Sequence, residues 1–111
     1  MAVRGILAQV FCSNIEISAE WYAHLIGRLH DFAPDEDTRI WRIGGDTALH
    51  LIENPVVVGD GRVILRVSQL QREIDRLGLG GELRQDGSGA TVLRMVDPDG
   101  NVTILMDASE A

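Results

Sequence analysis

The chain contains no lysine, because all ten of its basic residues are arginine. Schiff-base chemistry through a lysine amine is therefore excluded. The chain also has a single cysteine, Cys12, which cannot form an internal disulfide bond. Cys12 ends a run of apolar residues, and no base or positive dipole is indicated beside it. We therefore expect Cys12 to be a small core residue rather than a nucleophile.

Long apolar runs and an excess of positive charge are absent as well. No run approaches the roughly 20 apolar residues that cross a bilayer, and the first residues lack the apolar core of a signal peptide, so we expect a cytoplasmic protein without a membrane partner. Seventeen acidic residues against ten basic ones give a net charge of −7, and no basic stripe offsets it. We therefore expect no nucleic acid partner, because phosphate backbones would be repelled.

The clearest local pattern that is present lies at residues 92–106. Two runs of β-branched and large apolar residues flank Asp97-Pro98-Asp99-Gly100. Pro98 favours the second position of a turn, Asp97 can bond back to the turn, and Gly100 tolerates a positive φ. This stretch predicts a β-hairpin.

The first half of the chain predicts a strand, a helix and three further strands. Residues 5–12 are almost all apolar and suit a buried strand, and Asn14 suits the cap of a helix that ends at Gly27. Ile17, Trp21 and Leu25 form the apolar stripe of that helix. The three shorter strands are expected around 29–32, 38–43 and 47–52.

The second half repeats this order of elements. Ser68 is expected to cap a helix over 70–77, which ends at Gly78. Its strands are expected at 62–67, 82–85, 92–96 and 102–106. The sequence thus predicts one domain, 1–111, in which a connector at 55–61 joins module one (1–54) to module two (62–111).

These features carry a resemblance to a known family. Asp97-Pro98-Asp99-Gly100-Asn101 before a last apolar strand resembles the closing hairpin of the vicinal oxygen chelate (VOC) superfamily, which contains glyoxalases, bleomycin resistance proteins and extradiol dioxygenases. Trp21-Tyr22 ahead of Leu25-Ile26-Gly27 is similar to the end of that family's first helix. The resemblance covers nearly the whole chain. It implies an α+β fold in which two βαβββ modules form a curved eight-stranded mixed sheet around a cleft, with the helices outside.

The resemblance also implies a homodimer, because members of the family are often dimers and some exchange modules. The connector segment Val56-Val57-Val58 is the natural hinge for such an exchange. Whether the cleft is completed within one chain or between two stays open.

Metal enzymes of the superfamily bind a divalent ion through one residue from the first and fourth strands of each module. On this chain, the family spacing places Leu7, His50, Arg62 and Ile104 at those positions. Leu7 and Ile104 offer no donor atom, and the permanent charge of Arg62 opposes a cation. Gln9 could substitute only with a shift of about 7 Å along its strand. We therefore expect no metal cofactor.

Strand alternation assigns the residues that face the cleft. His50 should face it, because Leu49 and Leu51 suit the helix-covered side. His50 is either a ligand donor or acid–base group, or a hydrogen-bonded wall residue, and no catalytic residue is assigned. The expected lining is mainly apolar and consists of Gln9, Phe11, Trp41, His50, Arg62, Ile64, Arg66, Ile104 and Met106.

Arg62 and Arg66 in the cleft of an acidic protein favour an anionic ligand, unless they pair with Glu53 or Asp107. The leading hypothesis is a metal-independent, small-molecule-binding protein similar to the bleomycin-resistance branch of the superfamily. The alternative is an enzyme, either a glyoxalase-type lyase or isomerase or a dioxygenase, with a rearranged metal site of His50 plus Gln9 or Glu53.

Overall fold

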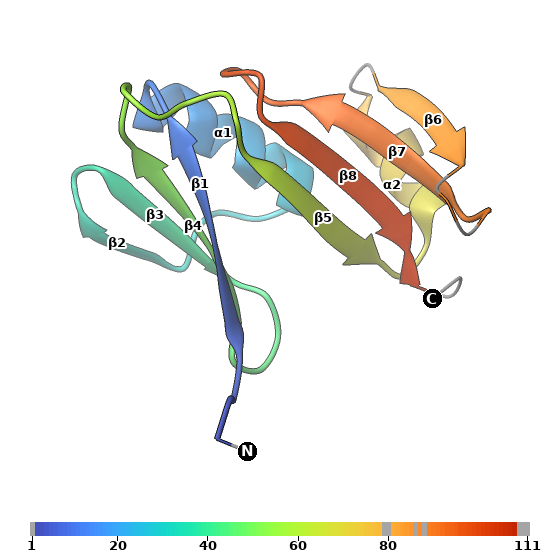
Figure 1. Ribbon diagram of the computed structural model, residues 1–111, viewed down its shortest axis with the longest axis horizontal. Coiled ribbons are helices and arrows are strands. Elements are labelled where there is room, and N and C mark those ends of the chain that lie inside the picture. Colours follow the sequence, from blue (N-terminus) through green and yellow to red (C-terminus); the bar gives the residue numbers. More distant parts are fainter. Residues whose placement is uncertain (1, 79–80, 86, 88, 109–111) are drawn as a thin grey trace.

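The computed structural model describes residues 2–78, 81–85, 87 and 89–108. Eight strands and two helices follow one another in two βαβββ modules (Figure 1). The elements of the first module are β1 (Ile6–Cys12), α1 (Ile15–Ile26), β2 (Phe32–Asp35), β3 (Thr38–Arg42) and β4 (Thr47–Glu53). Those of the second are β5 (Arg62–Val67), α2 (Leu70–Leu77), β6 (Glu82–Gln85), β7 (Thr91–Val96) and β8 (Val102–Asp107).

Each module forms one four-stranded sheet. The strand order is β1-β4-β3-β2 in the first sheet and β5-β8-β7-β6 in the second. The first pair of each sheet is parallel, and the other pairs are antiparallel. The predicted α+β fold of two βαβββ modules is confirmed, although the eight strands are divided between two sheets rather than joined in one. β1 and β5 lie next to each other where the sheets meet (Figure 1).

Both helices lie behind the sheets in Figure 1, so each sheet has a covered face and an open face. The covered faces and the helices share one continuous apolar core, which includes Val10, Tyr22, Leu49, Leu51, Val63, Leu77, Leu93 and Leu105. Cys12 is fully buried in this core, as predicted, and burial raises the pKa of its thiol to about 11. Within the described residues, neither helix is long and apolar enough to cross a membrane.

Helix α1 begins and ends as predicted but buries a different stripe. The Asn14 side chain accepts a hydrogen bond from the backbone N–H of Ile17 (3.1 Å), and Gly27 ends the helix with φ = 92°. The buried residues are Ile15, Ser18, Tyr22 and Leu25. The prediction for Ile17 was wrong, since its side chain is 59% exposed. The small Ser18 takes the buried position instead, where its Oγ lies 3.5 Å from the Asp99 carboxylate of module two.

The N-terminus of each helix receives an acid from the last residue of a strand. Glu53 at the end of β4 accepts a hydrogen bond from the backbone N–H of Ile15 (2.9 Å). Asp107 at the end of β8 accepts one from the backbone N–H of Leu70 (3.3 Å). The prediction that Ser68 caps α2 was wrong, because the cap position is Gln69 and Asp107 supplies the acceptor. Negative charge at both helix N-termini is favourable for the helix dipoles.

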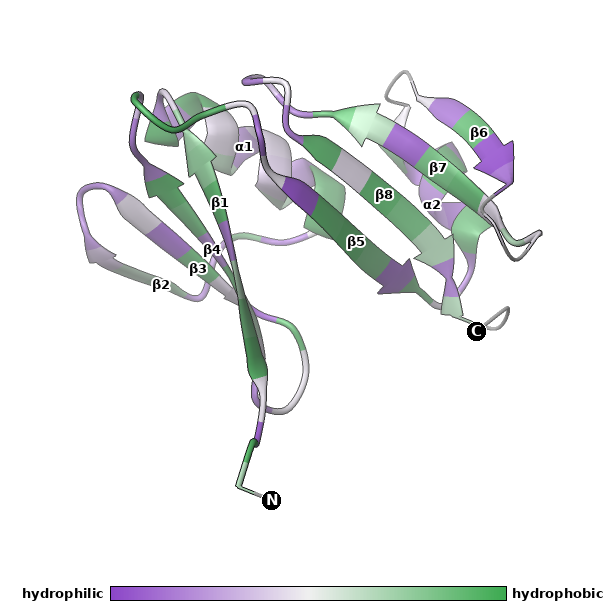
Figure 2. Cartoon of the chain, in the orientation of Figure 1, coloured by the Kyte–Doolittle hydropathy of each residue, from purple (hydrophilic) through white to green (hydrophobic). Residues whose placement is uncertain are grey.

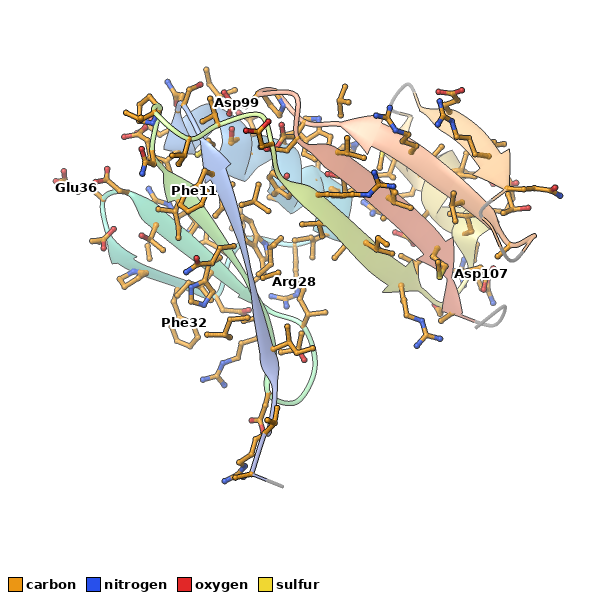
Figure 3. All side chains as sticks on the ribbon, viewed as in Figure 1. Phe11, Arg28, Phe32, Glu36, Asp99 and Asp107 are labelled. Carbon is orange, nitrogen blue, oxygen red and sulfur yellow. The ribbon has the colours of Figure 1, made fainter. Side chains whose placement is uncertain are left out.

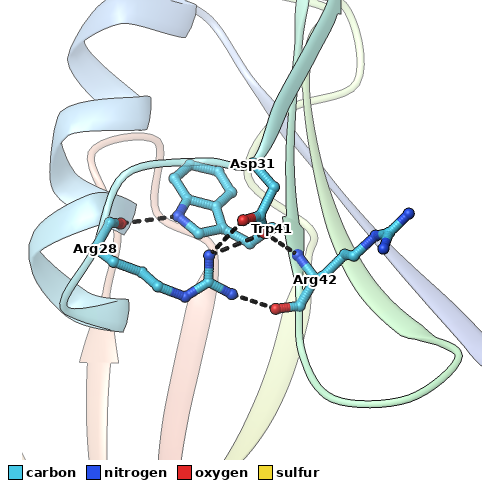
Figure 4. A network of polar contacts seen from close by, with 4 residues as sticks. All are labelled: Arg28, Asp31, Trp41 and Arg42. Atoms are coloured by element: carbon cyan, nitrogen blue, oxygen red, sulfur yellow. Dashed lines mark hydrogen bonds and ion pairs between the residues drawn. The ribbon is translucent and has the colours of Figure 1, made fainter.

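Strand β2 begins three residues later than the predicted strand around 29–32. Asp31 explains the delay, because its carboxylate accepts hydrogen bonds from the backbone N–H of Arg42 (2.7 Å) and from the guanidinium of Arg28 (2.9 Å) (Figure 4). These bonds, the backbone one first, hold the pKa of Asp31 below its usual value. The strand therefore starts at Phe32, which pairs with Ile40.

The β7–β8 turn joins the two modules. Asn101 donates to the backbone carbonyl of Phe11 in β1 (2.9 Å) and accepts from the backbone N–H of Gly61 ahead of β5 (2.8 Å). Asp99 accepts from the backbone N–H of Ser13 (3.0 Å). Figure 3 shows Asp99 near the ends of β1 and β5 and Asp107 at the opposite end of β8. The residues that carry the resemblance to the VOC superfamily therefore connect the modules to each other.

Arg76 of α2 makes a second connection, at the C-terminus of α1. Its guanidinium donates to the backbone carbonyls of His24 and Leu25, each at 2.7 Å, and also pairs with Glu73. A cation at this position satisfies carbonyls that have no partner within the helix. Arg76 of module two thus holds α2 against the C-terminus of α1 in module one.

Candidate functional site: the open faces of the two sheets

The strand register separates open-face from covered-face residues in the second sheet. Ile64 on β5 pairs with Ile104 on β8, and Ile104 in turn pairs with Arg94 on β7. Val63 and Leu105, one residue along, lie in the core beneath the helices. Arg62, Ile64, Ile104 and Met106 therefore face away from the helices, as the alternation predicted.

A pocket of about 390 Å³ lies on this open face, which is within the size range of small-molecule sites. Its floor is apolar and its rim is mainly arginine. The lining residues are Arg62, Ile64, Arg84, Gln85, Val92, Arg94, Ile104 and Met106. Four of them belong to the lining that the sequence predicts, namely Arg62, Ile64, Ile104 and Met106. In Figure 2 the two ends of β5 are hydrophilic and its centre hydrophobic, in keeping with this arrangement.

The arginines of this face differ in what they contact. Arg84 forms an ion pair with Glu82 (3.0 Å), and Arg66 donates to the backbone carbonyl of Ala108 (3.1 Å). Within the described part of the chain, Arg62 and Arg94 form no ion pair or hydrogen bond through their side chains. The predicted alternative of pairing with Glu53 or Asp107 is not observed for Arg62 or Arg66, since those acids hold the helix N-termini.

Glu82 is the acid that faces these arginines across the strands. It pairs in register with Arg94 and bonds to Arg84. The hydrogen bond from Arg84 and its charge, together with the charge of Arg94, lower the pKa of Glu82. Among the described residues of strands β5 to β8, the open face carries one carboxylate, that of Glu82, and four arginines, Arg62, Arg66, Arg84 and Arg94. This part of the face is therefore positive although the whole chain carries a net charge of −7.

The open face of the first sheet carries His50. Its register partners are Gln9 on β1 and Ile40 on β3, and the side chain is half-buried. Phe11 lies on the same face, two residues beyond Gln9, and Phe32 packs under the Arg42 guanidinium at 4.9 Å (Figure 3). His50 therefore faces away from α1, as predicted. It does not line the arginine pocket, which belongs to the second sheet.

Trp41 does not lie on the open face, and the prediction that it forms a wall of the cleft was wrong. It pairs with Leu49, on the covered face, and is fully buried. Its indole N–H donates to the backbone carbonyl of Arg28 (3.0 Å), as Figure 4 shows, and its ring contacts His30 edge-on. An internal acceptor for the indole N–H makes this burial favourable.

The residues that the resemblance assigns to the metal positions do not suit a divalent cation. Leu7 and Ile104 have no donor atoms, and Arg62 is a permanent cation. Among the described residues, no three His, Cys, Asp or Glu side chains are close enough to hold a metal ion. Of the alternative donors, Gln9 lies beside His50 across the parallel strands, whereas Glu53 points to the N-terminus of α1.

Arg84 and Arg94 were missed by the sequence prediction. Arg94 could have been found from the hairpin register, because the Asp97–Gly100 turn places Arg94 directly opposite Ile104. Arg84 has no such signal, because its place in the pocket depends on the pairing of the edge strand β6 with β7.

No family model and no curated protein matches this chain. Solved structures do match it. A glyoxalase/bleomycin resistance protein from Catenulispora acidiphila superposes with a TM-score of 0.86 at 21% identity, over 96% of this chain and 99% of its own. The chain has the fold of the VOC superfamily.

Two further matches show the range of proteins that share this fold. The bleomycin-binding protein of Streptomyces verticillus, in complex with copper(II)-bleomycin, has a TM-score of 0.77 at 15% identity and is covered over 98% of its length by 97% of this chain. A lactoylglutathione lyase from Agrobacterium tumefaciens has a TM-score of 0.73 at 13% identity, over 98% of this chain and 95% of its own. A binding protein and an enzyme thus share the VOC fold with this chain.

Proposed function

We propose that this VOC-fold protein is a metal-independent binding protein for a small organic molecule that carries negative charge. The observation that supports the proposal is the pocket on the second sheet, with an apolar floor around Ile64 and Ile104 and an arginine rim. Arginine binds carboxylate, phosphate and sulfonate groups through planar paired hydrogen bonds. The unsuitable residues at the family's metal positions favour holding a ligand over metal-assisted chemistry.

Thermal denaturation of chelator-treated protein in the presence of a panel of small organic acids tests this proposal. A ligand that binds only the folded state raises the midpoint of unfolding with concentration. We expect several acids of the panel to raise it without added metal. Stabilisation that appears only after a divalent metal is added, or no stabilisation by any compound, would contradict the proposal.

Two copies of the chain form the functional unit in this proposal. The open faces of both sheets lie on the same side of one chain (Figure 1), so neither covers the other. Apolar side chains remain exposed near the start of β1, with Ile6 at 70% and Leu7 at 61%. In this proposal a second copy covers these residues. Light scattering during gel filtration should give twice the mass of the 12.2 kDa chain, and a monomer at micromolar concentration would contradict it.

An enzymatic function is the second candidate, because Gln9 and His50 are adjacent on the open face of the first sheet. In that case the protein would be a glyoxalase-type lyase or isomerase, or a dioxygenase, with a rearranged metal site. Assays with a hemithioacetal and a catechol after the addition of Zn²⁺, Ni²⁺, Fe²⁺ or Mn²⁺ test it. Metal-dependent turnover that is lost in His50→Ala would favour the enzyme over the binding protein.

A further inference from the structure

We infer that the ligand is an amphipathic organic acid, held with its apolar body on the β5–β8 floor and its acidic group between Arg62 and Arg94. Arg84 does not bind the acidic group, because its guanidinium is already paired with Glu82. This inference rests on the proposed function and names the chemical class of its ligand. Arg62 and Arg94 thus have a different role from Arg66 and Arg84, although all four carry the same charge.

The floor of the pocket requires an apolar body. Ile64, Ile104, Met106 and Val92 form a continuous patch across three neighbouring strands. Ile64 is 54% exposed, so a ligand lying on it would remove apolar surface from water. A small inorganic anion could use the arginines but would leave this patch uncovered.

The acidic group is assigned to Arg62 and Arg94 because these two guanidinium groups have no ion-pair or hydrogen-bond partner within the described residues. They flank β8 from its two sides, Arg62 on β5 and Arg94 on β7. Both line the same pocket. A cation without a partner in a partly apolar pocket gains more from a ligand anion than one that must first give up a partner.

Arg84 and Arg66 are such cations with partners. Arg84 lines the pocket but bonds to Glu82 at 3.0 Å, and Arg66 bonds to the carbonyl of Ala108 at 3.1 Å. The Glu82 carboxylate also faces Arg94 across the strands, so it competes with a ligand anion for the same positive charge. Removing the charge of Glu82 should therefore strengthen binding of an anion, which a purely structural role for Glu82 does not predict.

A matched pair of fluorescent compounds tests the inference. 8-Anilinonaphthalene-1-sulfonate carries an acidic group on an aromatic body, and N-phenyl-1-naphthylamine is the same body without it. We expect the sulfonate to bind at least about tenfold more tightly than the neutral compound. Arg62→Gln and Arg94→Gln should each weaken sulfonate binding about tenfold and leave the neutral compound within twofold.

Three further variants provide the controls. Arg66→Gln removes a positive charge from the same face, but one whose guanidinium already has a hydrogen-bond partner. It should change the affinity for the sulfonate by no more than about twofold. Glu82→Gln should tighten sulfonate binding severalfold, because it frees Arg84 and removes a competing charge. Arg94→Lys keeps the charge without the planar fork and should retain part of the affinity, which separates loss of charge from loss of folding.

Equal affinity for the two compounds, or an Arg66→Gln effect as large as those of Arg62→Gln and Arg94→Gln, would overturn the inference and leave small-molecule binding in place. Failure of both compounds to bind would also overturn it. The proposed function is decided separately by the panel of organic acids, because stabilisation by any of them establishes metal-free binding. Weaker sulfonate binding in Glu82→Gln would contradict the role of Glu82.

Discussion

Tyr22 of α1 donates a hydrogen bond of 2.7 Å to the Asp97 carboxylate at the end of β7, and both residues are buried. Asp97 also accepts hydrogen bonds from the side-chain amide of Asn101 (2.8 Å) and from two backbone N–H groups of its own turn. Burial first, and then the bond and charge of Asp97, raise the pKa of Tyr22 far above its ordinary value. The tyrosine therefore stays a neutral donor across the physiological pH range, and it joins module one to module two.

Tyr22→Phe should lower the free energy of unfolding by about 2 kcal/mol, because it removes one donor from a buried carboxylate without opening a cavity. Urea denaturation followed by tryptophan fluorescence measures the change. Trp21→Phe, at the neighbouring and less buried position of α1, is the control for altering an aromatic side chain. An effect below about 0.5 kcal/mol would show that the bond contributes little to joining the modules.

Asn101→Ala should cost more, about 3 kcal/mol, because it leaves the Phe11 carbonyl and the Gly61 N–H without their partner. Asp99→Ala in the same turn should cost about 1 kcal/mol or less, because its bond to Ser13 is exposed to water. Hydrogen exchange provides a second measurement. Faster exchange at the ends of β1 and β5 in Asn101→Ala, with little change in β2 and β6, is the expected pattern, whereas uniform acceleration would point to global destabilisation.

Cys12 predicts a dependence of stability on alkaline pH. The folded thiol has a raised pKa of about 11 against an ordinary value of 9.0, so the folded state keeps its proton where the unfolded state loses it. The contribution of the protonated thiol to the stability of the folded state is fully present below pH 9 and is lost as the pH rises from 9 through 11. Relative to Cys12→Ala, the wild type should lose about 1 kcal/mol between pH 8 and pH 10. A constant difference between the two proteins over this range would contradict the raised pKa.

His50→Ala separates the binding function from the enzymatic one. Because the arginine pocket lies on the other sheet, binding of an organic acid should change less than twofold, with or without a chelator. Arg94→Gln serves as the variant that does lose binding. Near-stoichiometric Zn, Ni, Fe or Mn in protein purified without chelators, and lost in His50→Ala, would favour the metal enzyme instead.

Most of the fold could be predicted because its signals are local. Asn14 and Gly27 mark the two ends of α1, and the Asp97–Gly100 turn fixes the register of the last hairpin. The errors arose where a residue from another part of the fold decides. Ile17 suits the apolar stripe of an isolated helix, yet Ser18 is buried because the Asp99 turn approaches there. Ser68 is a good cap by itself, yet Asp107 satisfies the N-terminus of α2 from another strand.

The site could be predicted only in part for the same reason. Alternation within a strand placed Ile64 and His50 correctly on the open faces, because it depends on the strand alone. Trp41 was misplaced because a large aromatic residue suits either face of a sheet, and the acceptor for its indole N–H comes from Arg28, outside the strand. The role proposed for Arg94 depends on which neighbouring side chains already have partners, and strand periodicity carries no such information.

The bonds that join the two modules lie at the β7–β8 turn and between the helices, whereas the arginine pocket lies on the face of the second sheet that the helices leave open. The proposed ligand binding and the joining of the modules therefore use separate sets of side chains. Open-face residues such as Arg62 and Ile64 can be exchanged during evolution or engineering at little cost in folding. If the open face binds a ligand as proposed, single substitutions there can change its ligand preference without rebuilding the interior.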